Sequence, residues 1–399
     1  MKEWKTYALE EICTGKGTYG IGASAVAYDS SKYTYLRITD INDDGTLNKG
    51  ELKSVDDEEA YKYILQKNDI VFARTGNSTG RSYFYDGTDG ELVYAGFLIK
   101  FSLDPSKVNP RIMKYYTHSQ DYYDWVKSFD TGGTRGNINA KTYGLMPITL
   151  PPREVQDKIV EVLRSIDEKI ELNKRINDNL EQQAQALYKS WFIDNYQTEW
   201  PEYSLDEVTL KITDGVHNTV IDTPNGEYYL LSCKNIKNRR LNMSSSDRRI
   251  DEGTFNKLRK RTMLSKGDIL LSSVGTIGEL MLLNDDPHNY EFQRSVAIIK
   301  PNPVYISSYY LYETLISQID KITNTAHGAV QQCIFLSDLK EYTINIADKA
   351  LIRRYDIIVK PFFDEITKRE KEIARLTSLR DSLLPKLMSG ELKINEIDC

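Results

Sequence analysis

The stretch EWKTYALEEI (residues 3–12) returns in the middle of the chain as EWPEYSLDEV (residues 199–208), at an offset of 196 residues. Further along, LQKNDIVFARTG (residues 65–76) is matched in the same order by LSKGDILLSSVG (residues 264–275). Similarity at a long, nearly constant offset is the mark of a duplicated structural unit. The chain is therefore predicted to contain two copies of one unit.

The rear of each copy is predicted to be a long helix. Residues 151–195 match residues 347–391, again at an offset of 196, and both stretches carry apolar residues at alternating spacings of four and three. The first opens on Pro151-Pro152, which suits a first helical turn, and the second is stopped by Gly390. Such seams predict that the two helices pair as an antiparallel coiled coil, with two separate surface helices as the alternative.

The front of each copy is predicted to mix short strands with short helices. Apolar, β-like runs separated by Gly, Asn, Asp and Ser clusters lie at residues 33–38, 69–73, 97–101, 228–232, 268–273 and 296–300. Helices are expected at residues 110–129 and 307–323. The predicted fold class is α+β, with two similar domains of mixed α/β structure. The expected segments are 1–150 (first domain), 151–198 (first helix), 199–346 (second domain) and 347–399 (second helix).

The composition excludes several classes of protein. The 399 residues are 40% apolar and 28% charged, as in ordinary folded proteins, and no apolar run approaches the roughly 18 residues of a membrane span. The four cysteines are scattered and form no CxxC pair, which favours a reducing cytoplasm over a disulfide framework. A net charge of −6 disfavours a protein that coats nucleic acid through its bulk charge.

Catalytic and metal motifs are sparse. The string from Gly15 to Gly20 fits GxGxxG but lacks the strand before it and the helix after it that a dinucleotide site needs. A loop is the favoured interpretation, and a nucleotide-using enzyme stays open as an alternative. His327 and Cys333 could meet at a metal, but two ligands do not make a site. The sequence predicts no catalytic residue, no metal site and no cofactor on this chain.

Polar loops in both copies could contact nucleic acid, because Arg pairs with guanine and Asn or Gln with adenine in the major groove. Residues 234–261 also hold ten basic and three acidic residues, a pattern that suits phosphate contact or, alternatively, a solvated face. The DNA-binding candidates of the first copy are Arg74, Asn77, Ser78, Arg81, Thr134, Arg135, Asn137 and Asn139. Those of the second copy are Lys234, Asn235, Lys237, Arg239, Arg240, Ser272, Ser273, Thr276, His327, Gln331 and Gln332.

The chain resembles the specificity subunit of type I restriction–modification systems. The resemblance is carried by AQALYKSWFIDN (residues 184–195), LRDSLLPKLMSGELKI (379–394), LPPREVQDKIVEVL (150–163) and KGDILLSSVGTIG (266–278). One departure is Ala347-Asp348-Lys349, where the first copy has Pro-Pro-Arg-Glu, and it leaves the start of the second helix open.

The resemblance implies two target-recognition domains, each reading half of a bipartite, asymmetric site on double-stranded DNA. It implies that the helix pair sets the spacer and seats two methyltransferase subunits, joined by restriction subunits. It places S-adenosylmethionine, ATP and Mg on those partners, and it involves no membrane. Trp191, Phe192 and Leu387 are the expected subunit-docking residues. A coiled-coil adaptor without DNA readout remains the alternative.

Overall fold

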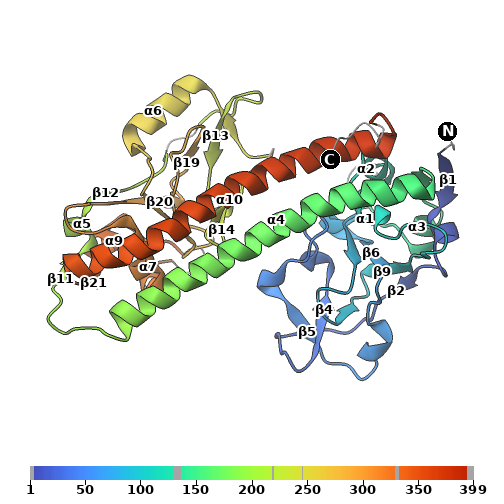
Figure 1. Ribbon diagram of the computed structural model, residues 1–399, viewed down its shortest axis with the longest axis horizontal. Coiled ribbons are helices and arrows are strands. Elements are labelled where there is room, and N and C mark those ends of the chain that lie inside the picture. The colour runs from blue at the N-terminus through green and yellow to red at the C-terminus, as the bar shows by residue number, and fades with distance from the viewer. Residues whose placement is uncertain (1–3, 130–135, 218–219, 245, 329–331, 393–399) are drawn as a thin grey trace. The chain divides into compact units, whose positions relative to one another are not determined.

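The computed structural model describes residues 4–129, 136–217, 220–244, 246–328 and 332–392. It divides into two compact units, in which unit 1 comprises Met1–Glu171 with Ala374–Cys399 and unit 2 comprises Leu172–Ile373. Each unit therefore holds one front domain together with a segment of each long helix (Figure 1).

The front domain of unit 1 contains three small sheets. The first has the strand order β2-β9-β6-β7 and is antiparallel throughout. The second has the order β3-β5-β4-β8, in which β4 and β8 run parallel, and in the third β1 pairs with β10. The strands are β1 (Lys5–Ala8), β2 (Thr18–Tyr19), β3 (Ala25–Val26), β4 (Tyr33–Leu36), β5 (Lys53–Val55), β6 (Asp69–Ala73), β7 (Ser82–Tyr85), β8 (Leu92–Tyr94), β9 (Leu98–Ser102) and β10 (Pro147–Leu150).

The front domain of unit 2 repeats most of this topology, but its second sheet has three strands, in the order β16-β13-β19, and a separate pair joins β14 to β15. Its antiparallel sheet has the order β12-β20-β17-β18, its second sheet keeps a parallel pair in β13 and β19, and β11 pairs with β21 as β1 does with β10. The strands are β11 (Glu202–Ser204), β12 (Thr209–Asp214), β13 (Tyr228–Leu231), β14 (Ile236–Lys237), β15 (Arg240–Leu241), β16 (Arg249–Ile250), β17 (Ile269–Ser272), β18 (Leu280–Leu282), β19 (Tyr290–Phe292), β20 (Val296–Pro301) and β21 (Thr343–Asn345). The duplication predicted from the sequence is thus present in the strand order.

Short helices cover the sheets and two long helices follow the domains. In unit 1 the short helices are α1 (Ile112–Tyr116), α2 (Gln120–Lys127) and α3 (Ala140–Gly144). In unit 2 they are α5 (Leu205–Val208), α6 (Glu252–Thr262), α7 (Ser308–Ser317), α8 (Ile319–Thr323) and α9 (Leu336–Glu341). The long helices are α4 (Arg153–Tyr188), which ends in a π-helical turn at Lys189–Ile193, and α10 (Lys349–Ser389).

The long helices run antiparallel within each unit. In unit 1, Arg380 of α10 donates to Asp167 of α4 at 3.3 Å. In unit 2, Arg369 of α10 donates to the amide oxygen of Asn173 at 2.8 Å, and the Tyr355 hydroxyl donates to the carbonyl of Ala184 at 3.2 Å. Asn173 of α4 is therefore both buried and hydrogen-bonded across the helix pair.

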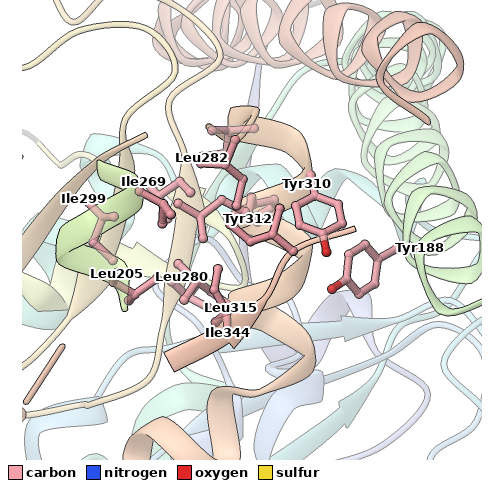
Figure 2. Close-up of a cluster of buried hydrophobic side chains, with 14 of the residues drawn as sticks. Tyr188, Leu205, Ile269, Leu280, Leu282, Ile299, Tyr310, Tyr312, Leu315 and Ile344 are labelled. Atoms are coloured by element: carbon pink, nitrogen blue, oxygen red, sulfur yellow. The ribbon is translucent and has the colours of Figure 1, made fainter. Parts of the chain in front are cut away.

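The core of each unit joins its front domain to its helix segments. In unit 2, Tyr188 of α4 belongs to the same buried cluster as Ile269 and Leu280 of the sheet, and its ring contacts the ring of Tyr310 on α7 (Figure 2). In unit 1, the corresponding cluster includes Leu163 of α4 and Leu387 of α10. The helices are therefore part of each core.

Several element boundaries differ from the predictions. The first long helix starts at Arg153 and leaves α geometry after Tyr188, earlier than Asn195. The second starts at Lys349, directly after the divergent Ala347-Asp348, and Gly390 ends it with φ of +75°. The helix expected over residues 110–129 is two helices, because Ser119 caps a new one by accepting from the amide of Tyr122. The helix α6 was not predicted.

Candidate functional site

Two of the predicted loops of unit 1 lie side by side. The amide of Ile138 donates to the carbonyl of Arg74 at 3.0 Å, and Thr75 forms an isolated bridge with Asn137. The hydroxyl of Thr79 also donates to the carbonyl of Gly136 at 3.0 Å. We name residues 74–81 and 136–139 loop pair 1.

Unit 2 builds the same arrangement from its own residues. The amide of Ile334 donates to the carbonyl of Ser273 at 2.9 Å, and Val274 bridges Cys333. We name residues 273–279 with 327–328 and 332–335 loop pair 2. These contacts repeat those of loop pair 1. Each loop pair therefore occupies the equivalent position in its own unit.

Glycines shape both loop pairs in the same way. Gly76 and Gly275 open the first loops with φ of +75° and +86°, and Gly80 and Gly278 close them with φ of +88° and +93°. The amide of Gly80 donates to Ala73 and that of Gly278 to Ser272, both at 3.0 Å. Left-handed φ favours glycine, so the backbone of the two loops is specified alike.

The side chains carried by this common backbone differ. Arg74 corresponds to Ser273, because the amide of each donates to the carbonyl of an equivalent residue. These carbonyls belong to Phe97, directly before β9, and to Ser295, directly before β20. By the same kind of hydrogen-bond matching, Arg81 corresponds to Glu279. At the second loop, Asn137 corresponds to Cys333, and the residue before α3 or α9 is Asn139 or Phe335. The two pairs therefore present different hydrogen-bonding groups.

In loop pair 1, the predicted residues divide into exposed and structural ones. Asn77 and Asn137 are exposed, whereas Ser78 is buried. Asn139 is exposed but caps α3, since its side chain accepts from the amide of Thr142 at 2.9 Å. Thr134 and Arg135 lie outside the described residues.

The two arginines of loop pair 1 have different surroundings. Arg81 pairs with Asp43 at 2.6 Å and donates to the carbonyl of Ile41 at 3.2 Å. The guanidinium carbon of Arg74 lies 5.1 Å from the centre of the Tyr19 ring. Tyr19 was not predicted as a site residue. The signal in the sequence was an aromatic residue directly before Gly20 of the GxGxxG string.

In loop pair 2, Thr276 and Gln332 are exposed. His327 is also exposed, but it contacts Asp338 at 3.0 Å and stacks on the ring of Phe335. Ser272 and Ser273 require correction as DNA-reading side chains, because both are buried; the Ser272 hydroxyl accepts from the amide of Glu279 at 2.8 Å. Gln331 lies outside the described residues.

Arg239 and Arg240 contact the long helices rather than standing free for phosphate. Arg240 forms ion pairs with Glu181 of α4 and with Glu370 of α10, the latter at 3.0 Å. Arg239 lies 3.9 Å from Glu181. Burial raises the pKa of Glu181 even though the two arginines oppose that shift. These arginines tie the front domain of unit 2 to its helices.

Most of the basic segment 234–261 is neutralised locally. Asn235, predicted to read DNA, is instead buried, and its amide nitrogen donates to Asn242 and Asp247 at 2.9 and 2.8 Å. Lys234 and Lys237 are both exposed, and Lys234 pairs with Asp247 at 3.0 Å. The further ion pairs are Arg248–Asp222, Arg259–Glu291 and Arg261–Asp214.

Two of the three predicted docking residues belong to the cores. Phe192 is 4% exposed and Leu387 is 1% exposed, so neither side chain can seat a partner. Both residues belong to an apolar pattern with helical spacing. Such a pattern is the same for residues in a protein core and for residues at a subunit interface. Trp191 is half-buried, and the guanidinium of Arg354 lies 5.7 Å from its ring centre.

The GxGxxG string does not form a phosphate-binding turn. It leads into the short strand β2, and a Cβ on Gly20 would lie 2.2 Å from the carbonyl oxygen of Tyr94. Close packing on β8 thus explains this glycine, and no helix follows to receive a phosphate. Across the described ranges, no group of three His, Cys, Asp or Glu side chains is placed to hold a metal. No described helix is both long and apolar enough to cross a membrane.

Comparisons with known proteins agree with this architecture. Residues 1–182 match the type I restriction modification DNA specificity domain. A type I restriction enzyme specificity subunit of Methanocaldococcus jannaschii is 26% identical over 71% of this chain and 69% of its own. One from Haemophilus influenzae is 28% identical over 49% of this chain and 42% of its own.

A solved structure shares the fold. The type I restriction–modification S subunit from M. genitalium superposes with a TM-score of 0.54 at 16% identity, over 97% of this chain and 96% of that one. The matched domain covers the first copy of the repeat, and the second copy has the same strand order in its antiparallel sheet. The first half of the chain therefore matches the type I restriction modification DNA specificity domain, and the chain has the fold of the solved S subunit.

Proposed function

We propose that the two loop pairs read the two halves of one bipartite, asymmetric DNA target. The observation that carries this proposal is the repeated loop geometry. Each pair has the same interloop hydrogen bond, at Ile138 and at Ile334, and the same glycine-shaped backbone. Their side chains nevertheless differ, so the two pairs would select different bases.

The groups in each pair suggest which base edges they would contact. Arg74 could pair with guanine, and the exposed amides of Asn77 and Asn137 with adenine. Loop pair 2 offers the hydroxyl of Thr276 and the amide of Gln332. The residues of loop pair 1 include arginine and those of loop pair 2 do not, so the two pairs together are expected to recognise a non-palindromic target.

We further propose that the helix pair sets the spacing between the half-sites. The helix α4 has 36 residues, of which Arg153 to Glu171 fall in unit 1 and the rest in unit 2. At about 1.5 Å per residue it is about 54 Å long, more than one DNA turn of about 34 Å. A continuous helix shared by both units is a suitable ruler, because its length does not depend on loop conformation.

Equivalent grooves support the docking of two methyltransferase subunits. Each groove lies where a front domain meets the start of its following long helix, with a volume of about 370 Å³ in unit 1 and 670 Å³ in unit 2. Matching lining residues are Lys67, Asn109 and Val160 in unit 1, and Lys266, Ser307 and Asp356 in unit 2. The partners, including restriction subunits, would bring S-adenosylmethionine, ATP and Mg, while this chain would contribute recognition alone.

Methylation-sensitive sequencing of cells carrying this chain and its methyltransferase partner tests the proposal. The expected result is a methylated motif with two different halves and a fixed spacer. A seven-residue insertion in both α4 and α10, at the boundary of the units, should lengthen the spacer by about three base pairs, since seven helical residues add about 10 Å. A change of the half-sites instead of the spacer would contradict the ruler. A coiled-coil adaptor would give no motif and no salt-dependent DNA binding. The cytoplasmic location stays a prediction.

A further inference from the structure

Arg74 differs from most arginines of the chain in what surrounds it. Arg240, Arg259 and Arg261 each contact a carboxylate of their own unit. Arg74 contacts a tyrosine face instead, and its buried Nε has no hydrogen-bond acceptor among the described residues. A buried donor without a hydrogen-bond acceptor costs free energy. We therefore expect the Arg74 guanidinium to find an acceptor in a bound partner.

Tyr19 holds this arginine in place from a second strand. Its ring lies under the guanidinium, with 5.1 Å between the guanidinium carbon and the ring centre. Its hydroxyl accepts from the amide of Ala140 at 3.1 Å, which ties the ring to the end of the second loop. The ring remains 42% exposed, so the Arg74–Tyr19 stack lies at the surface. One side chain therefore links Arg74 to both loops of loop pair 1.

Such a stack prepares an arginine to bind a flat pair of acceptors. Arginine loses rotamer entropy when its side chain is fixed, and a stacked guanidinium has already lost part of that entropy before binding. Its remaining N–H groups form a fork that fits two oxygens of a phosphate or the O6 and N7 of guanine. Both are anionic or electron-rich acceptor pairs of a DNA duplex.

We propose that Tyr19 is a positioning residue that presents the Arg74 guanidinium to DNA in the half-site read by unit 1. This inference rests on the proposed function of loop pair 1. The contact has no counterpart in unit 2, where the position of Arg74 is taken by the buried Ser273. Tyr19 therefore determines binding in one half-site only.

The test uses the assembled complex of this chain with its methyltransferase partner and fluorescent duplexes carrying the motif found by sequencing. Tyr19→Phe keeps the ring and removes the hydrogen bond, Tyr19→Leu removes both, and Arg74→Ala removes the cation. Tyr19→Leu should weaken target binding about fivefold, and Tyr19→Phe less. In the Arg74→Ala background, Tyr19→Leu should have no further effect. Equal weakening in both backgrounds, or no weakening at all, would overturn the proposal.

Two further measurements identify the acceptor and distinguish the positioning role of Tyr19 from the proposed reading function of loop pair 1. If the acceptor is guanine, 7-deazaguanine at one position of the first half-site abolishes the Tyr19→Leu effect; if it is phosphate, the slope of log affinity against log salt falls by about 1. Asn137→Ala serves as the reference, because it alters loop pair 1 without touching Tyr19. Loss of first-half discrimination in Asn137→Ala together with unchanged target affinity in the Tyr19 variants rejects positioning alone. Intact discrimination in all of them rejects the reading function itself. Equal urea midpoints for the variants and the parent chain exclude unfolding.

Discussion

Units 1 and 2 share a strand order but use different chemistry at equivalent places. Residues Ala60–Tyr63 form a single 3₁₀ turn in unit 1, where unit 2 has the eleven-residue helix α6. Loop pair 1 is rich in Arg and Asn, and loop pair 2 is not. The backbone pattern that presents the loops is the same in both. The backbone of the loops and the side chains that they carry are therefore separable, so the side chains can vary while the fold is kept.

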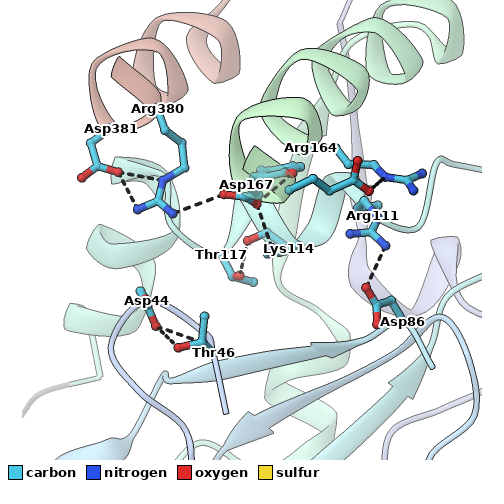
Figure 3. A network of polar contacts seen from close by, with 12 residues as sticks. Asp44, Thr46, Asp86, Arg111, Lys114, Thr117, Arg164, Asp167, Arg380 and Asp381 are labelled. Atoms are coloured by element: carbon cyan, nitrogen blue, oxygen red, sulfur yellow. Dashed lines mark hydrogen bonds and ion pairs between the residues drawn. The ribbon is translucent and has the colours of Figure 1, made fainter. Parts of the chain in front are cut away.

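The contact between front domain and helix differs as well. In unit 1, Asp167 of α4 contacts Lys114 at 2.8 Å and Arg380 at 3.3 Å (Figure 3). Burial opposes ionisation of Asp167, but the two cations outweigh it and its pKa is lowered. In unit 2, burial raises the pKa of Glu313 on α7 to about 8. These two carboxyl groups therefore contribute pH dependences of opposite sign to stability.

The largest expected effect is the pH dependence of unit 2. Because Glu313 holds its proton up to about pH 8 when folded and only to about 4.5 when unfolded, its contribution is fully present below about pH 4.5 and is lost as pH rises through about 8. The free energy of unfolding of unit 2 should fall by about 4 kcal/mol between pH 5 and pH 9. Hydrogen exchange of α7 measures this loss.

Glu313→Gln should flatten that dependence, since the amide does not titrate. Unit 1 provides the internal control: the lowered pKa of Asp167 gives stability that is present above its ordinary value of 3.8 and lost only in acid. A steep loss in unit 2 that survives the substitution would show that another group is responsible.

The next prediction concerns a lysine–aspartate ion pair that occurs in the antiparallel sheet of each unit. Lys300 contacts Asp268 at 2.5 Å with both side chains buried, whereas Lys100 lies 3.4 Å from Asp69 and is 20% exposed. Lys300→Met should destabilise unit 2 by about 3 kcal/mol, because the buried Asp268 carboxylate loses its cation. Lys100→Met should cost about 1 kcal/mol, since the Lys100–Asp69 contact is longer and Lys100 is partly exposed. Hydrogen exchange of β17 and β6 reports each unit; equal losses would contradict the difference.

A smaller and equal effect is expected where the two units are alike. Gly80→Ala and Gly278→Ala each place a Cβ on a residue with left-handed φ, 2.6 Å from Val126 and 2.8 Å from Thr323. Each substitution should cost about 1–2 kcal/mol and weaken recognition of its own half-site. Urea unfolding and binding to half-site-substituted duplexes measure the two effects. A large cost in one unit only would mean that the loops are not built alike.

The smallest effect separates a free lysine from a paired arginine in unit 2. Lys237→Ala should leave stability unchanged and reduce the salt slope of DNA binding by about 1, if the exposed lysine contacts phosphate. Arg240→Ala should instead lower stability, because Glu181 and Glu370 lose their cation. Reversed outcomes for the two variants would place the phosphate contact at Arg240.

The sequence predicts features that depend on local pattern or on repetition. The offset of 196 residues foretells the duplicated strand order, strand β6 matches residues 69–73, and Gly390 marks the end of α10. It also identifies the loops that become loop pairs 1 and 2. These are properties of neighbouring residues, or of two segments compared with one another.

Properties that depend on distant residues could not be predicted. The ion pair of Arg240 with Glu181 joins residues 59 positions apart, so a basic run in sequence became a set of internal contacts. Burial of Asn235 depends in part on its bond to Asp247 in a following loop. Tyr19 was missed because its relation to Arg74 exists only when β2 lies beside β9 and β6 in one sheet.

The central claim is that each unit reads one half-site independently of the other. Methylation-sensitive sequencing of cells expressing the Asn77→Ala/Asn137→Ala chain and, separately, the Thr276→Ala/Gln332→Ala chain tests it most directly. We expect each double variant to relax one half of the methylated motif, by about 1–3 kcal/mol per lost base contact, with the other half and the spacer unchanged. A change in both halves from either variant, or an unaltered motif from both, would contradict it.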